Sequence, residues 1–276
     1  MSLGIFGRNI KLARTWDELN EIQLQEIAGS LEHFQKFKDC HPVDFLPAIF
    51  SRLYVSLVKN LLRTNNPVKT YIALKQLPPD EYQENVQFLL KGNQRTVFPK
   101  AIRVGFFKKT TFHPPGPRLN NIVVKEFSFA DAMFYRWREL QDDRYLDLLC
   151  AVLYREAGGE KETDIRKEFQ NELVDKNLHL WKKVRRKRKL AIAYAYEGSR
   201  NYMAGRHLNV FPPAPKPTEE EKLKPRPKAK YVPFGKLISA KAEYKPHQLA
   251  AVENLNLYKF LGLFDNELSE NQKSKK

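Results

Sequence analysis

Cysteine is scarce in this sequence, with two residues among 276, Cys40 and Cys150. They do not form a Cys-x-x-Cys pair, so neither a disulfide framework nor a cysteine-rich zinc site is predicted. Each lies beside apolar residues, a pattern typical of a buried, reduced thiol. A reducing compartment is therefore expected.

Long uncharged apolar runs are absent as well. No stretch approaches the roughly 20 apolar residues that a membrane-spanning helix needs. The N-terminal segment MSLGIFGRNIKLARTW has no apolar core of signal-peptide length. The chain is expected to be soluble and intracellular, without a membrane partner.

The residue patterns of common catalytic sites are also missing. The pair Gly158-Gly159 lies in an acidic stretch without the Lys-Ser/Thr of a phosphate-binding loop, and no Gly-x-Ser-x-Gly occurs. The six histidines show no metal-ligand spacing. Asp142, Asp143 and Asp147 would suit a two-metal site, but capping of the helix that follows explains them better. No catalytic residue, cofactor or metal ligand is predicted, and an enzyme is not expected.

Acidic residues are outnumbered by basic ones, 32 against 48, which leaves a net charge of +16. The segment 182–200 alone contributes seven of these positive charges. Such a balance favours acidic partners but says nothing about fold. With 42% hydrophobic residues, the chain can bury a core in one large or two small domains.

Helical periodicity dominates the sequence. Thr15 and Glu18 have capping-box spacing before the first helix, Pro47 fits the first turn of the second, and Gly92 fits the end of the third. Ser128 and Asp131 have the same capping-box spacing. The expected helices are 15–31, 44–63, 79–92, 128–141, 143–156, one long helix over 164–203, and 246–264.

Between 97 and 127 the pattern changes to alternating β-branched and aromatic residues around the loop 113-HPPGPRLNN. Two or three short strands are expected there, the last over 122–127, whereas 156–164 is expected to be an acidic loop. Seven prolines and many charges make 212–233 a poorly folded, basic linker or arm.

The predicted fold is therefore mainly α: a multi-helix core with a small β-hairpin insertion near 97–127, a Pro-rich basic arm and a C-terminal amphipathic helix. Four regions are expected. They are an N-terminal helical region (1–95), the β insertion with the helical core (96–205), the arm (206–245), and the final helix with a polar tail (246–276).

One run of charge stands out, 182-KKVRRKRK. If 164–203 is one helix, Trp181, Val184 and Ala191 form an apolar stripe, and the aliphatic stems of Lys187 and Arg188 complete it. Three interpretations stay open: a solvated helix face, a contact with an acidic partner or a phosphate backbone, and a nuclear localisation signal. The candidate contact residues are Lys182, Lys183, Arg185, Arg186, Lys187, Arg188 and Lys189.

Aromatic residues gather in a second segment and allow two interpretations. They could form a base-stacking platform, but their helix-like spacing favours core packing. The set consists of Phe127, Phe129, Phe134, Tyr135, Trp137 and Tyr154.

Several segments resemble proteins from the tail-morphogenesis region of tailed bacteriophages, namely tail-assembly-chaperone-like and minor structural proteins. The segment 15-TWDELNEIQLQEI is similar to a Trp-Asp/Asn-Glu-Leu-Thr-x-x-Gln motif of such chains, with Asn20 where threonine is usual. The segments 126-EFSFADAMFYRW and 146-LDLLCAVLYRE resemble a second motif that ends in Ala-x-Leu-Tyr-Arg. The segments 190-LAIAYAYEGSRNYM and 254-NLNLYKFLGLFDNE are also similar in residue pattern to the ends of these chains. The three clearer segments, 15–27, 126–137 and 146–156, cover about an eighth of the sequence.

The resemblance implies a non-enzymatic protein that acts through protein–protein contacts. The implied partners are phage structural proteins, such as a tape-measure, tube or connector protein, with helix-in-groove capture as the mechanism. The implied location is the cytoplasm of the bacterial host, or the virion. The alternative function is non-specific nucleic-acid binding by the basic helix and the arm.

Overall fold

The computed structural model describes residues 2–5, 8–40, 46–63, 67–105, 109–161, 164–213, 233–243 and 245–273. The chain forms two compact units, Met1–Lys100 with Lys183–Ser199, and Ala101–Lys182 with Arg200–Lys276. The fold is mainly α with a small antiparallel sheet, as predicted. None of the helices in the described ranges combines the length and apolarity needed to cross a membrane.

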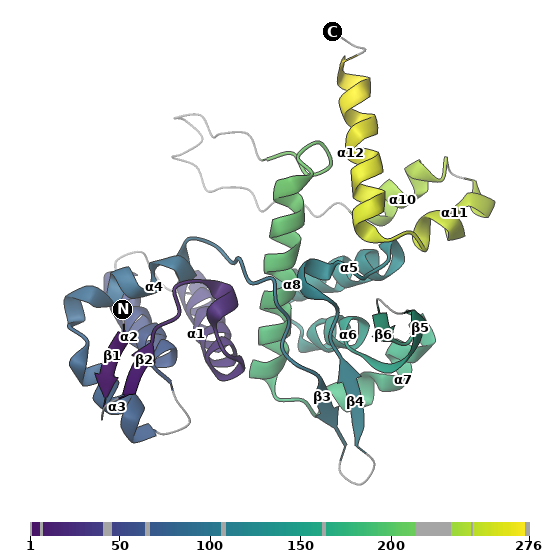
Figure 1. Cartoon of the computed structure of the whole chain (residues 1–276). Helices are drawn as coiled ribbons and strands as arrows, with labels where there is room; N and C mark the ends of the chain where they lie inside the picture. The colour runs from purple at the N-terminus through teal and green to yellow at the C-terminus, as the bar shows by residue number, and fades with distance from the viewer. Residues whose placement is uncertain are drawn as a thin grey trace. The chain divides into compact units, whose positions relative to one another are not determined.

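The first unit is a group of helices with a two-stranded hairpin (Figure 1). Its core contains the fully buried Leu24, Ile27, Leu57 and Leu62. The strands β1 (Ser2–Ile5) and β2 (Arg8–Lys11) pair antiparallel, and neither is predicted from the sequence. The helices are η1 (Trp16–Glu18), α1 (Glu21–Cys40), α2 (Leu46–Leu61), α3 (Pro67–Gln76), η3 (Pro79–Glu81), α4 (Tyr82–Leu90) and the first part of α8 (Arg186–Arg206).

The capping box of the first long helix lies five residues later than predicted. Thr15 makes no side-chain capping bond, and the Glu18 carboxylate accepts from the Arg14 backbone N–H instead, at 2.9 Å. The Asn20 side chain accepts from the Gln23 N–H at 2.9 Å, and Gln23 accepts from the Asn20 N–H at 3.0 Å. This reciprocal pair is a capping box, so α1 runs from Glu21 to Cys40 rather than over 15–31.

The predicted positions of Pro47 at a helix start and of Gly92 after a helix end are confirmed. Helix α2 contains Pro47 in its first turn, where a missing N–H costs little. Helix α4 is followed by Gly92 in the left-handed region, at φ 124°, a conformation that favours glycine. Helix α3 has no counterpart among the predicted helices.

The second unit combines a four-stranded antiparallel sheet, in the order β3-β4-β5-β6, with helices (Figure 1). Its core includes the fully buried Phe112, Trp137, Tyr154 and Trp181. The strands are β3 (Ile102–Val104), β4 (Thr110–His113), β5 (Arg155–Lys161) and β6 (Asp164–Arg166). The helices are η4 (Pro117–Leu119), α5 (Val124–Leu140), α6 (Asp143–Leu153), α7 (Asn171–Trp181), the end of α8, α10 (Gly235–Lys241), α11 (Pro246–Glu253) and α12 (Leu257–Lys273).

Three predictions around this sheet are wrong. Residues 122–127 do not form a strand, because α5 begins at Val124 and only Val123 makes a single bridge. Ser128 lies inside α5, and Asp131 is buried and paired with Arg200 at 2.7 Å, so they form no capping box. The expected acidic loop 156–164 is mostly strand, because it pairs with β4 and β6.

The prediction of one long helix over 164–203 is also wrong. Its first residues form β6, α7 ends at Trp181, and α8 begins at Arg186 after a turn. Like charges at i and i+4, such as Lys183 with Lys187 and Arg185 with Lys189, disfavour a continuous helix here.

The C-terminal region differs in detail from the prediction. The expected helix 246–264 consists of α11 and α12, separated at residues 254–256. Helix α10 lies within the region 206–245 that is predicted as an arm, and most of the predicted Pro-rich linker, 214–232, lies outside the described residues. The predicted region boundary at 95–96 lies close to residue 100, whereas the return of 183–199 to the first unit has no counterpart in the predicted regions.

Candidate functional site

The predicted basic contact residues are divided between a turn and the first turn of α8. Lys182, Lys183 and Arg185 precede the helix and are exposed. Lys189, by contrast, is only 5% exposed. Lys187 is exposed, and Arg186 and Arg188 are half-buried. The seven residues therefore do not form one uniformly accessible surface, and their contact with a partner stays a prediction.

Acidic residues of α1 cover part of the basic run. The Lys187 ammonium lies 2.6 Å from the Glu26 carboxylate, which also binds Arg63 at 2.9 Å. The Arg186 guanidinium lies 3.8 Å from Glu32, whose side chain is 3% exposed. An acidic surface that meets these two cations thus belongs to the same unit of the same chain.

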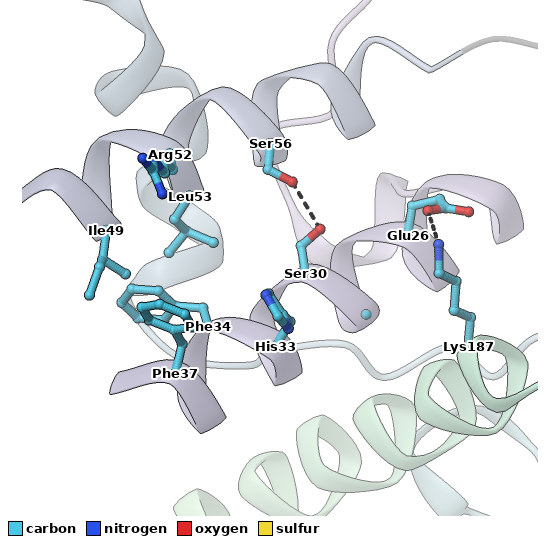
Figure 2. Close-up of a pocket in the computed structure, with 11 residues that line it drawn as sticks. Glu26, Ser30, His33, Phe34, Phe37, Ile49, Arg52, Leu53, Ser56 and Lys187 are labelled. Carbon is cyan, nitrogen blue, oxygen red and sulfur yellow. Dashed lines mark hydrogen bonds and ion pairs between the residues drawn. The ribbon is translucent and has the colours of Figure 1, made fainter. Parts of the chain in front are cut away.

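The stem of Lys187 covers α1, which agrees with the predicted role of its methylene groups. Three of its side-chain carbons would lie 3.5–3.7 Å from a Cβ at Gly29. These are ordinary van der Waals distances, so the stem packs directly against α1 at Gly29. The charged end then reaches Glu26 at the rim of the groove described next (Figure 2).

A groove of about 410 Å³ lies between α1 and α2, with Lys187 at its edge (Figure 2). Its apolar wall consists of Phe34 and Phe37 from α1 with Ile49 and Leu53 from α2. Phe34 packs against Phe50 with ring centroids 5.0 Å apart. The polar residues that line it are Glu26, Ser30, His33, Arg52, Ser56 and Lys187. We call this feature the α1–α2 groove.

Hydrogen bonds tie the two helices together at one end of the α1–α2 groove. Ser30 and Ser56 share a hydrogen bond of 3.1 Å between their hydroxyl oxygens. The Asn60 amide donates to the Ser30 hydroxyl at 2.9 Å. Farther along, the Gln23 amide donates to the Leu61 carbonyl. These bonds hold the spacing of α1 and α2, so the groove is preformed at this end.

The charge at the rim of the groove is mainly positive. Glu26 is already neutralised by Lys187 and Arg63. Arg52 is exposed and forms no ion pair among the described residues. His33, which also lines the groove, is exposed. An occupant with an acidic residue near its apolar face would match this rim.

The α1–α2 groove has no counterpart among the predictions, because the first predicted helix ends at residue 31. Phe34 and Phe37 lie in the last third of α1, outside the predicted range. A signal was present: 33-HFQKF repeats an aromatic residue at a helical interval, and Ile49 with Leu53 has i, i+4 spacing. That two such pairs face each other depends on the packing of α1 on α2.

A second cavity, of about 820 Å³, lies in the second unit and is polar. Glu126, which lines it, is 1% exposed and accepts from Arg155 at 2.8 Å and from Arg166 at 2.9 Å. Arg166 also binds Asp164 at 2.8 Å. We call these four residues the buried charge network. Burial alone lowers the pKa of Arg166, but Glu126 and Asp164 outweigh it and raise that pKa above its ordinary value.

The buried charge network is internally satisfied. Besides Glu126, Arg155 donates to the carbonyls of Val152 and Lys167, each at 2.7 Å. Arg166 donates to the Leu153 carbonyl at 2.7 Å and to both oxygens of Asp164. Two cations and two carboxylates balance, and the donors already have acceptors. The network therefore fastens α5 to β5 and β6 and offers little to a ligand.

The carboxylates Asp142 and Asp147, which the sequence suggested for a metal site, have structural roles. Asp142 accepts from the Arg144 N–H at 2.8 Å and caps α6, as predicted. Asp147 is buried within α6. In the described ranges, no group of three or more histidine, cysteine, aspartate or glutamate side chains is placed to hold a metal ion.

The predicted aromatic set is largely core. Phe127, Phe134, Trp137 and Tyr154 are buried, which confirms the packing interpretation for these four. Phe129 and Tyr135 are half-buried; Phe129 contacts Phe169, with ring centroids 5.8 Å apart. A base-stacking platform would need exposed ring faces.

No family model, curated protein or solved structure matches the chain. The α1–α2 groove is therefore the feature from which a function is best inferred. It is the only one of the two cavities described above whose lining is largely apolar and whose rim carries an unpaired charge.

Proposed function

We propose that this protein is a non-enzymatic phage morphogenesis protein, a tail-assembly chaperone or minor structural protein, that binds an amphipathic helix of a partner in the α1–α2 groove. The groove itself carries the proposal. The likeness of 15–27, 126–137 and 146–156 to tail-morphogenesis proteins supplies the biological setting. A tape-measure protein, which is long and rich in apolar helical segments, is the proposed partner.

The mechanism follows from the lining of the groove. Apolar residues at i, i+3, i+4 and i+7 of a partner helix would contact Phe34, Phe37 and Ile49. Each fully buried leucine contributes about 1.5–3 kcal/mol. Three such anchors contribute about 4.5–9 kcal/mol before the entropy cost of association is subtracted, so a weak, reversible complex is expected.

The charge of the rim selects among amphipathic helices. Exposed Arg52 and the Lys187–Glu26–Arg63 cluster leave a net positive edge. A helix with glutamate beside its apolar stripe would be attracted, and one with lysine there would be repelled. The proposed occupant is thus an acidic amphipathic helix.

A peptide titration tests the groove directly. The probe is a labelled peptide of about 18 residues, or five helical turns, with leucine at i, i+3, i+4 and i+7 and a glutamate-rich polar face. We expect Ile49→Asp to weaken binding at least about tenfold, because it places a charge against the apolar anchors. Fluorescence anisotropy measures the dissociation constant.

Val55→Asp is the matched control. Val55 lies on the same helix, is 43% exposed and does not line the groove, so its substitution should leave peptide affinity within about twofold. Equal affinity for glutamate- and lysine-faced peptides, or equal loss in both variants, would refute the groove mechanism.

Co-expression with the tape-measure protein of the same genome tests the proposed partner. The wild type should keep the tape-measure protein in solution, and the Ile49→Asp variant should not.

A second candidate, non-specific nucleic-acid binding, is favoured by a specific observation. Lys182, Lys183 and Arg185 are exposed and form no ion pair among the described residues. Changing these three to glutamine should reduce affinity for duplex DNA, and lower the slope of log K against log salt by about 2–3, since each phosphate contact contributes about 0.9. An unchanged slope in a filter-binding titration would exclude this turn as the contact.

A further inference from the structure

Two guanidinium groups of the second unit converge on one tyrosine hydroxyl. The Arg206 guanidinium donates to the Tyr202 hydroxyl at 2.8 Å, and that of Arg118 does so at 3.3 Å. Both guanidinium carbons also lie near the ring, 5.7 Å and 4.6 Å from its centroid. We call these three residues the Arg118–Tyr202–Arg206 cluster.

The segment that carries Arg118 is fixed on α12. The Tyr258 hydroxyl donates to the Arg118 carbonyl at 2.7 Å. The Asn256 amide donates to the Asn120 carbonyl at 2.8 Å. The backbone of Arg118 is therefore held from outside its own turn, and the contacts with Tyr202 position its guanidinium.

The same backbone is held in an unfavourable conformation. Arg118 and Leu119 have φ angles of 58° and 62°, in the left-handed region that non-glycine residues avoid. The side chain of Leu119 is fully buried, which anchors the turn in the core. Consecutive non-glycine residues in this region persist only where the surroundings impose them, and they concentrate at binding and active sites.

The charge of the cluster is not compensated within the described chain. Neither Arg118 nor Arg206 forms an ion pair with a carboxylate there. Arg200, one to two turns away on α8, shows the contrast, because it pairs with Asp131 at 2.7 Å. The hydrogen bond from Arg206 lowers the pKa of Tyr202, and the charges of Arg118 and Arg206 act in the same direction against burial. The surroundings of the hydroxyl thus favour negative charge.

We propose that the Arg118–Tyr202–Arg206 cluster binds a dianionic phosphate, as inorganic phosphate or as the terminal phosphate of a nucleotide or nucleic-acid end. Guanidinium groups match phosphate oxygens with paired, charge-assisted hydrogen bonds. Two of them balance the charge of about −2 on a terminal phosphate near neutral pH. The site lies in the second unit and is independent of the α1–α2 groove.

Titration of the full chain with sodium phosphate, followed by the NMR signals of the arginine Nε–H groups, tests the site. We expect Arg118→Gln and Arg206→Gln each to weaken phosphate binding at least about tenfold, since each removes a charge-assisted donor pair. Tyr202→Phe should retain binding, because both guanidiniums remain and lose only an internal acceptor. Phosphate should also raise the pKa of Tyr202, read from tyrosinate absorbance, as it neutralises Arg118 and Arg206.

Arg144→Gln is the matched control, because it removes an exposed arginine on α6 of the same unit. It should leave phosphate affinity unchanged. Adenosine 5′-monophosphate and oligonucleotides with and without a 5′-phosphate identify the source: stronger binding of the phosphorylated oligonucleotide assigns the site to a nucleic-acid end, and stronger binding of inorganic phosphate or the mononucleotide assigns it to free phosphate.

A cluster that serves only to hold the turn on α12 would behave differently. Arg118→Gln and Arg206→Gln would then lower the melting temperature while phosphate shifted no arginine signal, and the proposal would be overturned. Equal phosphate affinity in the wild type, Arg118→Gln and Arg206→Gln would overturn it as well. If Arg118→Gln fails to fold by circular dichroism, Arg206→Gln, which is on the exposed end of α8, decides alone.

Discussion

Replacing Glu126 with glutamine is expected to lower the free energy of unfolding of the second unit by about 3–5 kcal/mol, the usual cost of removing one partner from a buried ion pair. Glu126 accepts from Arg155 at 2.8 Å and from Arg166 at 2.9 Å, and all three side chains are at most 6% exposed. Without its charge, two guanidiniums stay buried beside Asp164 alone. The substitution keeps the side-chain volume, so the loss is electrostatic rather than a cavity effect.

Urea denaturation followed by circular dichroism measures this change, and hydrogen exchange of α5, β5 and β6 locates it. Glu168→Gln is the matched control, since its side chain is 61% exposed and pairs with Lys125 at 3.7 Å. An exposed pair of this kind contributes about 0–1 kcal/mol. A loss below about 1 kcal/mol for Glu126→Gln would mean that the network does not fasten the sheet to α5.

The second large effect is expected at Gly198, where α8 approaches the segment before β3 within the first unit. A Cβ there would lie 2.2 Å from the Arg95 carbonyl oxygen and 2.5 Å from its nitrogen. Backbone atoms must move to admit it, and Arg95 is itself buried, donating to the carbonyls of Trp16 and Leu19. Gly198→Ala should therefore destabilise the first unit by about 3 kcal/mol, the upper part of the range for overpacking.

Gly205→Ala on the same helix provides the comparison. A Cβ at Gly205 meets no atom within 4 Å. The higher helix propensity of alanine should stabilise the protein by about 0.5–1 kcal/mol. Chemical denaturation of both variants separates the two effects, and equal stability would show that α8 can shift away from Arg95 at little cost.

Local signals predicted the ends of several helices correctly. Pro47 in the first turn of α2, Gly92 after α4 and Asp142 as the cap of α6 act through their own backbone neighbours. Such signals need no information from distant residues. The predominance of helix follows from the same short-range periodicity.

Local signals failed at 15–23, where a residue between the two possible caps is bound by a distant segment. In 15–23 two capping boxes could form, and the one at Asn20 and Gln23 does. Asp17, between them, accepts from the Thr96 N–H and hydroxyl at 2.8 and 2.7 Å. This contact spans 79 residues of sequence, so no window around Thr15 contains it.

The charged run 182–189 shows most clearly which properties the sequence alone determines and which depend on the tertiary structure. The sequence by itself determined that seven cations follow Trp181 and that the chain is basic and mainly helical. Only the tertiary structure decided that Lys187 meets Glu26, 161 residues away, that Lys189 is buried, and that Lys183 stays exposed. The physical reason is that composition sets the number of charges, whereas burial and pairing depend on which helix packs beside them.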